Sequence, residues 1–296
     1  MKSGFVTVIG RPNVGKSTLI NTIVGEKIAI TSSKPQTTRN LIQGIYNEED
    51  TQIVFVDTPG IHKPIHRLGL KLNDQAYSSI NDVDLILFIV DASVSIGTGD
   101  KFIIDKLSSI DKPVILILNK IDRIKNEDIL TKIDEYKDLY DFSEIIPVSA
   151  IKNDNVDRLI TTLKKYLPDS VKYFPDNDTK TSSSTDFRIC ETVREKLLEL
   201  TNEEVPHSVA CLITNITQKP NILEIYIDII VDRDSLKKII IGKKGSKLKE
   251  IGTLARIDLE QMLNKQVYLE LNVRTIKKWR DKEKYLTELG FDDYKN

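Results

Sequence analysis

The sequence is poor in cysteine, the residue whose disulfide bonds stabilise small secreted domains. It contains only two cysteines, Cys190 and Cys211, in 296 residues. Two cysteines cannot form a disulfide framework, and their separation does not match the spacing of a metal site. We therefore interpret both as buried structural thiols in a reducing compartment.

The sequence also lacks long hydrophobic runs and a large net charge. Apolar stretches such as residues 85–90 are far shorter than the roughly 20 residues that a helix needs to cross a bilayer. Residues 1–11 lack the apolar region that is typical of a signal peptide, and their pattern predicts a strand. These absences predict a cytoplasmic protein and leave peripheral contact with a membrane open. Because the net charge is only −1, any nucleic-acid site must come from local clustering of charge.

Short runs rich in valine, isoleucine and leucine recur through the first half of the chain, separated by segments long enough for helices. The runs lie at residues 5–9, 53–56, 85–90, 114–118 and 145–148. This alternation predicts an α/β domain with a mostly parallel, doubly wound sheet that helices cover on both faces. Ligands bind such sheets at the carboxyl ends of the strands.

A change in composition near residue 168 divides the chain. Segment 169–186, which follows Pro168, is rich in aspartate and serine, which predicts a linker between a first domain, 1–168, and a second domain, 187–296. The pattern of the second domain predicts an α+β module with elements at residues 186–200, 208–217, 222–231, 235–241, 246–263 and 267–273. We place Arg194, Glu195 and Lys196 on the solvent side of its first helix.

A glycine-rich motif follows the first predicted strand directly and fits G-x-x-x-x-G-K-[ST]. The glycines let backbone N–H groups point at phosphate oxygens, and the helix that follows adds the positive end of its dipole. Lys16 is expected to reach the β- and γ-phosphates, and the Ser17 hydroxyl to ligate Mg²⁺. The candidate binding residues are Gly10, Arg11, Pro12, Asn13, Val14, Gly15, Lys16, Ser17 and Thr18.

A second motif predicts contacts to the metal and to the γ-phosphate. Asp57 can hold Mg²⁺ through water, and the Gly60 N–H can bond the γ-phosphate. A threonine between the first helix and this strand can complete the Mg²⁺ shell and leave it after hydrolysis. We favour Thr38 for this role over its neighbour Thr37. The motif itself, which follows the second predicted strand, is Asp57, Thr58, Pro59 and Gly60.

A third motif selects the base. Asn119, Lys120 and Asp122 follow the run at 114–118, and Ser149 and Ala150 follow the run at 145–148. An ionised aspartate only accepts hydrogen bonds, so Asp122 suits the N–H groups of guanine and repels the bare N1 of adenine. The backbone at Ser149 and Ala150 supplies an N–H for guanine O6. The sequence therefore predicts GTP and GDP as ligands.

These motifs make residues 1–168 a predicted GTP-binding (G) domain. They predict a Mg²⁺-dependent GTP phosphohydrolase in which water attacks the γ-phosphate. Lys16, Thr38 and Gly60 are the candidate catalytic residues. Ile61 stands where Ras-like proteins place a glutamine that orients water, which predicts slow intrinsic hydrolysis. Asn13 either helps to bind a K⁺ ion or stabilises the loop, and the sequence leaves both roles open.

A second glycine motif lies between two predicted helices of the second domain. Gly242 and Gly245 enclose two lysines, as in the turn with which KH domains grip about four nucleotides of single-stranded nucleic acid. The order of elements predicts a type II KH domain. The predicted groove floor is Ile239, Ile240, Ile241 and Leu248. Candidate RNA contacts are Ile241, Gly242, Lys243, Lys244, Gly245, Ser246, Lys247 and Lys249.

The charge around this motif favours RNA as the ligand. Residues 233–284 contain 15 Lys and Arg against 7 Asp and Glu, which gives a local charge of +8. Such a patch attracts phosphates through counterion release. Trp279, which follows two lysines, either stacks a base or packs on the core of the domain.

Together these motifs resemble the Era family of bacterial GTPases. The matching segments are residues 10–18, 35–39, 57–60, 119–122, 193–196, 232–235, 240–249 and 277–280. The resemblance covers essentially the whole chain. It implies a P-loop GTPase domain followed by a KH domain.

The resemblance also implies a biological role. Members of the family bind the 3′ end of 16S rRNA during maturation of the 30S ribosomal subunit, and GTP favours the arrangement that binds RNA. They are cytoplasmic and partly associated with the inner face of the plasma membrane, and we expect a monomer. One alternative is a membrane-associated signalling GTPase whose KH domain docks proteins. Another is an RNA chaperone in which GTP only regulates a structural role.

Overall fold

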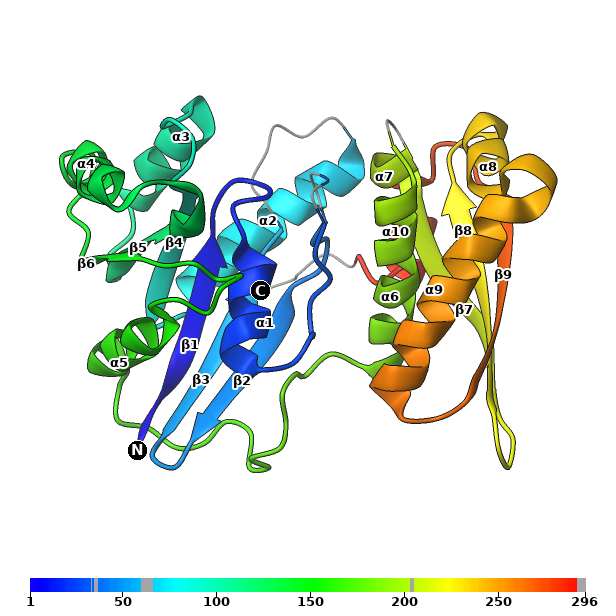
Figure 1. The fold of residues 1–296 in the computed structure, drawn as a ribbon, viewed down its shortest axis with the longest axis horizontal. Helices are drawn as coiled ribbons and strands as arrows, with labels where there is room; N and C mark the ends of the chain where they lie inside the picture. The colour runs from blue at the N-terminus through cyan, green and yellow to red at the C-terminus, as the bar shows by residue number, and fades with distance from the viewer. Residues whose placement is uncertain (33, 35–36, 60–65, 203–204, 292–296) are drawn as a thin grey trace. The chain divides into compact units, whose positions relative to one another are not determined.

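The structure is a computed structural model that describes residues 1–32, 34, 37–59, 66–202 and 205–291. The chain divides into two units, each with its own sheet (Figure 1). The first unit contains Met1–Thr31, Thr38–Lys63 and Leu72–Ser182. The second contains Ser32–Thr37, Pro64–Lys71 and Ser183–Asn296. Two short pieces of the predicted G domain thus group with the second unit.

The first unit is built on six strands in the order β2-β3-β1-β4-β5-β6. All neighbouring pairs are parallel except β2 and β3. β3 and β5 are buried along their whole length, as expected for strands of a parallel sheet that is covered on both faces. The strands are β1 (Lys2–Ile9), β2 (Ile42–Glu48), β3 (Thr51–Asp57), β4 (Leu85–Asp91), β5 (Val114–Asn119) and β6 (Glu144–Pro147).

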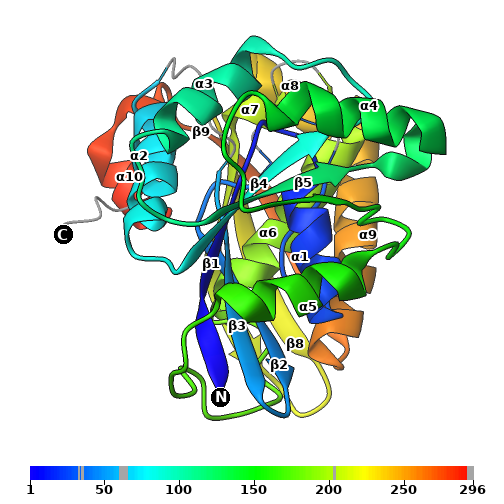
Figure 2. The same cartoon turned by 90° about the vertical axis from the view of Figure 1, so that its left-hand side faces the viewer.

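Helices cover both faces of this sheet (Figure 2). α1 (Lys16–Val24) and α5 (Val156–Tyr166) lie on one face, and α2 (Arg67–Asn81), α3 (Thr98–Leu107) and α4 (Asn126–Lys137) lie on the other. Buried residues of α2, α3 and α4 form one core with β4 and β5. The predicted α/β class with a mostly parallel sheet is confirmed. The sequence did not predict β2, an edge strand in which polar residues and a glycine weaken the apolar signal.

The segment after α5 binds along the first unit. Gln52, which is fully buried in β3, donates to the carbonyl of Phe174 at 2.8 Å. It also accepts hydrogen bonds from the N–H groups of Tyr173 and Phe174 at 2.8 and 3.0 Å. Further along, an isolated bridge joins the segment to Gly44 of β2. The first unit therefore extends to residue 182, close to the predicted end of the linker at 186.

The second unit has a three-stranded sheet in the order β7-β8-β9. β7 (Val209–Gln218) and β8 (Leu223–Val231) are antiparallel, and β9 (Val267–Thr275) runs parallel to β8. Apolar residues of α6 (Thr185–Leu200), α8 (Asp234–Ile241) and α9 (Ser246–Leu263) form a single core with this sheet. The order α6-β7-β8-α8-α9-β9 is the predicted type II KH arrangement. α7 (Val205–Ser208) and α10 (Glu283–Glu288) are short.

The prediction that α6 presents its charged residues to solvent is wrong. Arg194, Glu195 and Lys196 are all buried. The Lys196 ammonium lies 2.8 Å from the Asp258 carboxylate of α9, so its charge has a partner within the unit. Long charged side chains can cover apolar surface while their ends find polar partners, which periodicity alone does not reveal.

Trp279 packs in the core of the second unit. Its side chain is fully buried, and the indole N–H donates to the carbonyl of Ser208 at 3.1 Å. Buried indoles usually have such a partner. Of the two roles that the sequence leaves open, the structure therefore has the packing role.

The structure also tests the expectations for the two cysteines and for membrane-spanning helices. Cys190 and Cys211 form no disulfide and are each partly buried, so their burial is less complete than predicted. Within the described residues, no helix is both long enough and apolar enough to cross a membrane.

Replacing Gln52 with alanine should destabilise the first unit. The change leaves two N–H groups and one carbonyl of residues 173–174 without partners, which costs about 1–3 kcal/mol. Urea denaturation should show a lower midpoint, and amide exchange at Tyr173 and Phe174 should accelerate. Gln43→Ala is the matched control, because among the described residues Gln43 Oε1 accepts a hydrogen bond from the exposed Ser182 hydroxyl, at 2.7 Å, and from no backbone N–H of the segment. Equal shifts for the two variants would contradict this account of the segment.

Candidate functional site

The loop between β1 and α1 is shaped to receive phosphate groups. Gly15 precedes α1 with a φ of 103°, and a side chain at this position would collide with the Asn119 side chain. The loop lies at the positive end of the α1 dipole, where an anion is favoured. The Lys16 ammonium donates to the carbonyls of Gly10 and Arg11 at 3.1 and 3.0 Å. Lys16 thus lies across the loop that we expect the phosphates to occupy.

Burial governs the charges of Lys16 and Asp57. It lowers the pKa of the Lys16 amine to about 8, although the Asp57 carboxylate acts to raise this pKa. Burial also raises the pKa of Asp57, against the opposing effects of Lys16 and of the Ser17 and Thr38 hydroxyls. A nearby negative charge favours the protonated amine. A phosphate at this site would therefore hold Lys16 in its charged form.

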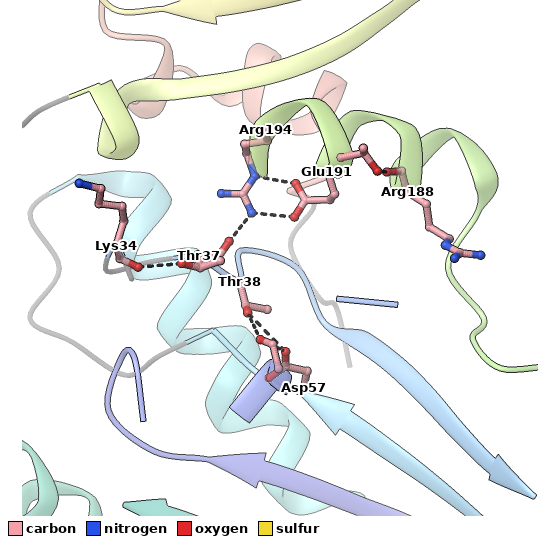
Figure 3. Close-up of polar contacts among 9 residues, drawn as sticks. Lys34, Thr37, Thr38, Asp57, Arg188, Glu191 and Arg194 are labelled. Carbon is pink, nitrogen blue, oxygen red and sulfur yellow. Dashed lines mark hydrogen bonds and ion pairs between the residues drawn. The ribbon is translucent and has the colours of Figure 1, made fainter. Parts of the chain in front are cut away.

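Three oxygen-bearing side chains meet at the end of β3, and Figure 3 shows two of them, Thr38 and Asp57. The Ser17 hydroxyl donates to Asp57 Oδ2 at 2.6 Å and lies 2.9 Å from Thr38 Oγ1. Thr38 Oγ1 donates to the same carboxylate oxygen at 3.3 Å. Asp57 Oδ1 is buried and accepts no well-formed hydrogen bond from the described residues. Two hydroxyls and a carboxylate with an open oxygen fit Mg²⁺, a cation that prefers oxygen ligands.

Thr37 has a different place from Thr38. Its hydroxyl donates to the carbonyl of Lys34 at 2.7 Å and does not join the group around Asp57. The structure thus gives only Thr38, the residue favoured from the sequence, the position that a metal ligand requires. The assignment of Thr38 to Mg²⁺ stays a prediction.

The motif predicted to read the base ties distant loops together. Asn119 Nδ2 donates to the carbonyl of Val14 at 2.8 Å, and Asn119 Oδ1 accepts from the N–H of Ala150 at 3.0 Å. The Ser149 hydroxyl donates to Asp122 Oδ1 at 2.5 Å. Residues from three separate loops of the sequence are therefore brought together, as binding of a guanine nucleotide requires.

Asp91, at the end of β4, is a site residue that the sequence analysis missed. The Lys120 ammonium lies 2.6 Å from the Asp91 carboxylate and donates to the carbonyl of Asn13 at 2.6 Å. Burial acts to raise the pKa of Asp91, but hydrogen bonds from Lys120 and Ser93 bring it below its usual value. The pair fixes the Lys120 side chain beside the predicted base site. A signal was present, since Asp91 follows an apolar run just as Asp57 does.

Asp100, in the first turn of α3, is a second acid that was missed. It is fully buried, lies 2.8 Å from Arg11 Nε, and accepts from the N–H of Gly97 at 2.9 Å. This ion pair anchors the phosphate loop to the start of α3. A single acid in a helical stretch carries no distinctive signal in the sequence.

Some predicted residues cannot be placed. Gly60 and Ile61 lie outside the described residues, so the γ-phosphate contact and the slow hydrolysis remain predictions. Thr58 is buried and donates to the carbonyl of Val8 at 2.8 Å, which holds the end of β3 against β1. Asn13 has a left-handed backbone with a φ of 65°. Its role toward K⁺ also stays a prediction.

The turn between α8 and α9 has the backbone that a KH clamp requires. Gly242 has a φ of 72°, and a side chain there would collide with Lys247. Lys243 and Lys244 are both exposed, so their charges are accessible to a nucleic-acid backbone. Lys247, by contrast, donates to the carbonyl of Leu200 at 2.9 Å. Its charge is therefore partly used within the unit.

The predicted groove floor needs one correction. Ile240 is fully buried in the core of the second unit, whereas its neighbour Ile239 is 45% exposed. Ile241 and Leu248 are partly buried against the same core. Successive residues of a helix face different directions, so a run of three isoleucines cannot all line one groove.

Comparisons with known proteins agree with the two predicted domains. Residues 5–120 match the family described as 50S ribosome-binding GTPase, and residues 204–280 match the KH domain family. A crystal structure of a variant of Aquifex aeolicus Era bound to GDP and AlF4⁻ is 43% identical, with a TM-score of 0.95 over 98% of this chain and 99% of that one. A structure of Era in complex with MgGDPNP and nucleotides 1506–1542 of 16S ribosomal RNA matches with the same values.

Replacing Asp122 with asparagine should change the preferred base. Two hydrogen bonds from guanine to a carboxylate are lost, which should weaken GDP binding by about 10²-fold or more. The new amide can donate to the O2 carbonyl of xanthine, so affinity for xanthosine diphosphate should rise. Competition against a fluorescent nucleotide measures both. Ser149→Ala, which removes only a neighbour of the carboxylate, should leave the base preference as it is. An unchanged preference in the Asp122 variant would contradict the assignment.

Nucleotide affinity should fall above the pKa of Lys16. The free site binds phosphate best with Lys16 protonated, and bound phosphate raises the pKa of Lys16. Affinity should therefore be flat below pH 8 and about tenfold lower at pH 9 than at pH 7. Titration with GDP at several pH values tests this. The Lys16→Arg variant keeps its positive charge over the whole pH range. Any fall in its affinity for GDP with pH therefore comes from groups other than residue 16, such as the guanine base. Identical profiles for the two proteins would exclude Lys16 as the titrating group.

Proposed function

The chain belongs to the Era family of GTPases, and from this membership and the geometry of the Gly242–Gly245 turn we propose that it binds single-stranded RNA at the 3′ end of 16S rRNA. We propose that it does so during assembly of the small ribosomal subunit. The observation that carries the proposal is the exposed pair Lys243 and Lys244 on a strained glycine turn of a KH unit. The Era structure that contains nucleotides 1506–1542 of 16S rRNA supports the choice of RNA.

The residues of the first unit divide the work of GTP hydrolysis. Lys16 and the loop amides stabilise negative charge on the β- and γ-phosphates as water attacks. Asp122 and Asn119 hold the base and its loop, and Lys120 supports them through Asp91. Ser17, Thr38 and Asp57 are the residues that would hold Mg²⁺. Mg²⁺, when bound, supplies positive charge to the phosphate oxygens.

Hydrolysis of GTP would change the protein from one binding state to another, and the phosphate that it releases would not itself be the purpose of the reaction. Thr38 would complete the metal site in the GTP form and leave it after hydrolysis, which allows an ordered and a released form of the segment before β2. In the proposed cycle, the GTP form binds RNA and the GDP form releases it. We further propose a cytoplasmic location, with peripheral contact at the plasma membrane as the finer expectation from the family.

The first test is affinity for a short RNA that copies the 3′ end of 16S rRNA. The protein should bind it more tightly than a scrambled RNA, and more tightly with a non-hydrolysable GTP analogue than with GDP. Lys243→Ala with Lys244→Ala should weaken binding and reduce the slope of log affinity against log salt by roughly 1.4. Fluorescence anisotropy at several stated salt concentrations measures all three quantities.

A matched double variant controls for general positive charge. Lys277 and Lys278 are also adjacent and exposed but lie after β9, so their replacement should affect RNA binding less. Weak, equal binding of both RNAs in every nucleotide state would remove the ribosomal role. In that case the KH unit would serve the alternative function of docking proteins, and the lysine variants would have no effect.

A further inference from the structure

The segment Ser32–Thr37 precedes Thr38 but groups with the second unit, and α6 of that unit binds it. One guanidinium N–H of Arg194, from Nη2, donates to the backbone carbonyl of Thr37 (Figure 3). At the other end of the segment, Lys34 Nζ donates to Asn202 Oδ1 at 2.6 Å. The Thr37 hydroxyl closes a turn onto the Lys34 carbonyl at 2.7 Å. Lys34 and Thr37 are thus each held by the second unit and by a hydrogen bond to one another.

Arg194 is itself held rigidly. Glu191, one turn earlier on α6, accepts from Arg194 Nε and Nη2 through its two carboxylate oxygens, each at 2.6 Å. The side chains are only 3% and 12% exposed. Burial acts to lower the pKa of Arg194, but Glu191 more than offsets this, so the pKa lies above its usual value. Arg194 therefore presents a permanent charge in a fixed fork geometry, which a lysine cannot reproduce.

One of the points at which the chain passes from one unit to the other is the Thr37–Thr38 peptide bond. Thr37 belongs to the second unit through Arg194, and Thr38 belongs to the first through Ser17 and Asp57. Because a peptide bond is planar, fixing the Thr37 carbonyl also fixes the direction of the Thr38 N–H. Only the rotations within Thr38 then remain to place its hydroxyl.

We propose that Arg194 is a positioning residue for GTP hydrolysis, which holds the Thr37 carbonyl and thereby keeps the Thr38 hydroxyl at the metal site. It touches neither nucleotide nor metal, and it acts through the chain. The inference rests on the GTP site described above and does not depend on which RNA is bound. It assigns a role in the nucleotide cycle to a residue of the KH unit.

Arg194→Ala tests this by nucleotide preference. Without Arg194, the segment before Thr38 loses its charge-assisted hydrogen bond, so the form that needs Thr38 at the metal becomes less favourable. Affinity for a fluorescent GTP analogue with Mg²⁺ should fall roughly tenfold, while affinity for GDP should stay within about twofold. Arg194→Lys should recover only part of the loss. Single-turnover hydrolysis should slow in parallel.

Two comparisons separate positioning from a purely structural role. Arg188 lies on the same helix and points away from Thr37 (Figure 3), so Arg188→Ala removes the same charge from α6 and leaves the contact to the Thr37 carbonyl in place. It should leave the ratio of analogue to GDP affinity unchanged. In a Thr38→Ala background, Arg194→Ala should cause no further loss, because the group through which it acts is absent.

The possible outcomes decide the proposal. Equal losses of analogue and GDP affinity in Arg194→Ala, or an added loss in the Thr38→Ala background, would overturn it. If Arg194→Ala does not fold, Glu191→Gln keeps the shape of the pair and should lower analogue affinity about threefold, with GDP affinity retained; no change there would also overturn it. Failure of the unmodified protein to bind any guanine nucleotide would instead refute the GTP site itself.

Discussion

The burial of the Asp57 carboxylate is the constraint on which the nucleotide site depends. A charged carboxylate in a fully buried strand is costly unless cations and hydrogen-bond donors surround it. The Ser17 and Thr38 hydroxyls supply hydrogen bonds, and Lys16 supplies a positive charge. Lys16 and Ser17 begin α1, and Thr38 lies before β2. The position of α1, the path of the segment before β2 and the end of β3 are therefore coupled through one side chain. These two hydroxyls and the carboxylate are also oxygen ligands of the kind that Mg²⁺ prefers.

The topology of the sheet explains why the other functional residues lie nearby. β1, β3, β4, β5 and β6 are parallel, so their carboxyl ends meet at one edge. Gly10, Asp57, Asp91 and Asn119 lie at or just after four of these ends. β2 is antiparallel and contributes none of them. This edge also concentrates charge, because Asp57 and Asp91 face Lys16 and Lys120 where an anionic ligand is expected.

The sequence predicted what depends on local pattern and missed what depends on partners far along the chain. Strand runs, the phosphate loop, the base motif and the KH turn each carry a short-range signal. The structure brings the phosphate loop and the base motif together in the first unit and forms the KH turn in the second. Asp100 and Arg194 carry none, since their roles come from Arg11 and from the carbonyl of Thr37. Every residue has a backbone carbonyl, so the sequence does not show which carbonyl accepts a hydrogen bond from a given side chain. Trp279 could not be decided for a similar reason, because its partner is the carbonyl of Ser208.

The magnitude of one contact is enough to couple the nucleotide site to the KH unit. A hydrogen bond from a charged group contributes about 1.5–3 kcal/mol, and coupling free energies between sites are typically about 1–3 kcal/mol. The Arg194–Thr37 contact alone therefore accounts for an effect of the usual size, with no need for a long pathway of residues. Because coupling of binding is reciprocal, a ligand that favours Thr38 beside Asp57 must favour Thr37 on Arg194 by the same free energy. A ligand of the KH unit that disturbs α6 must then weaken the binding of GTP more than that of GDP.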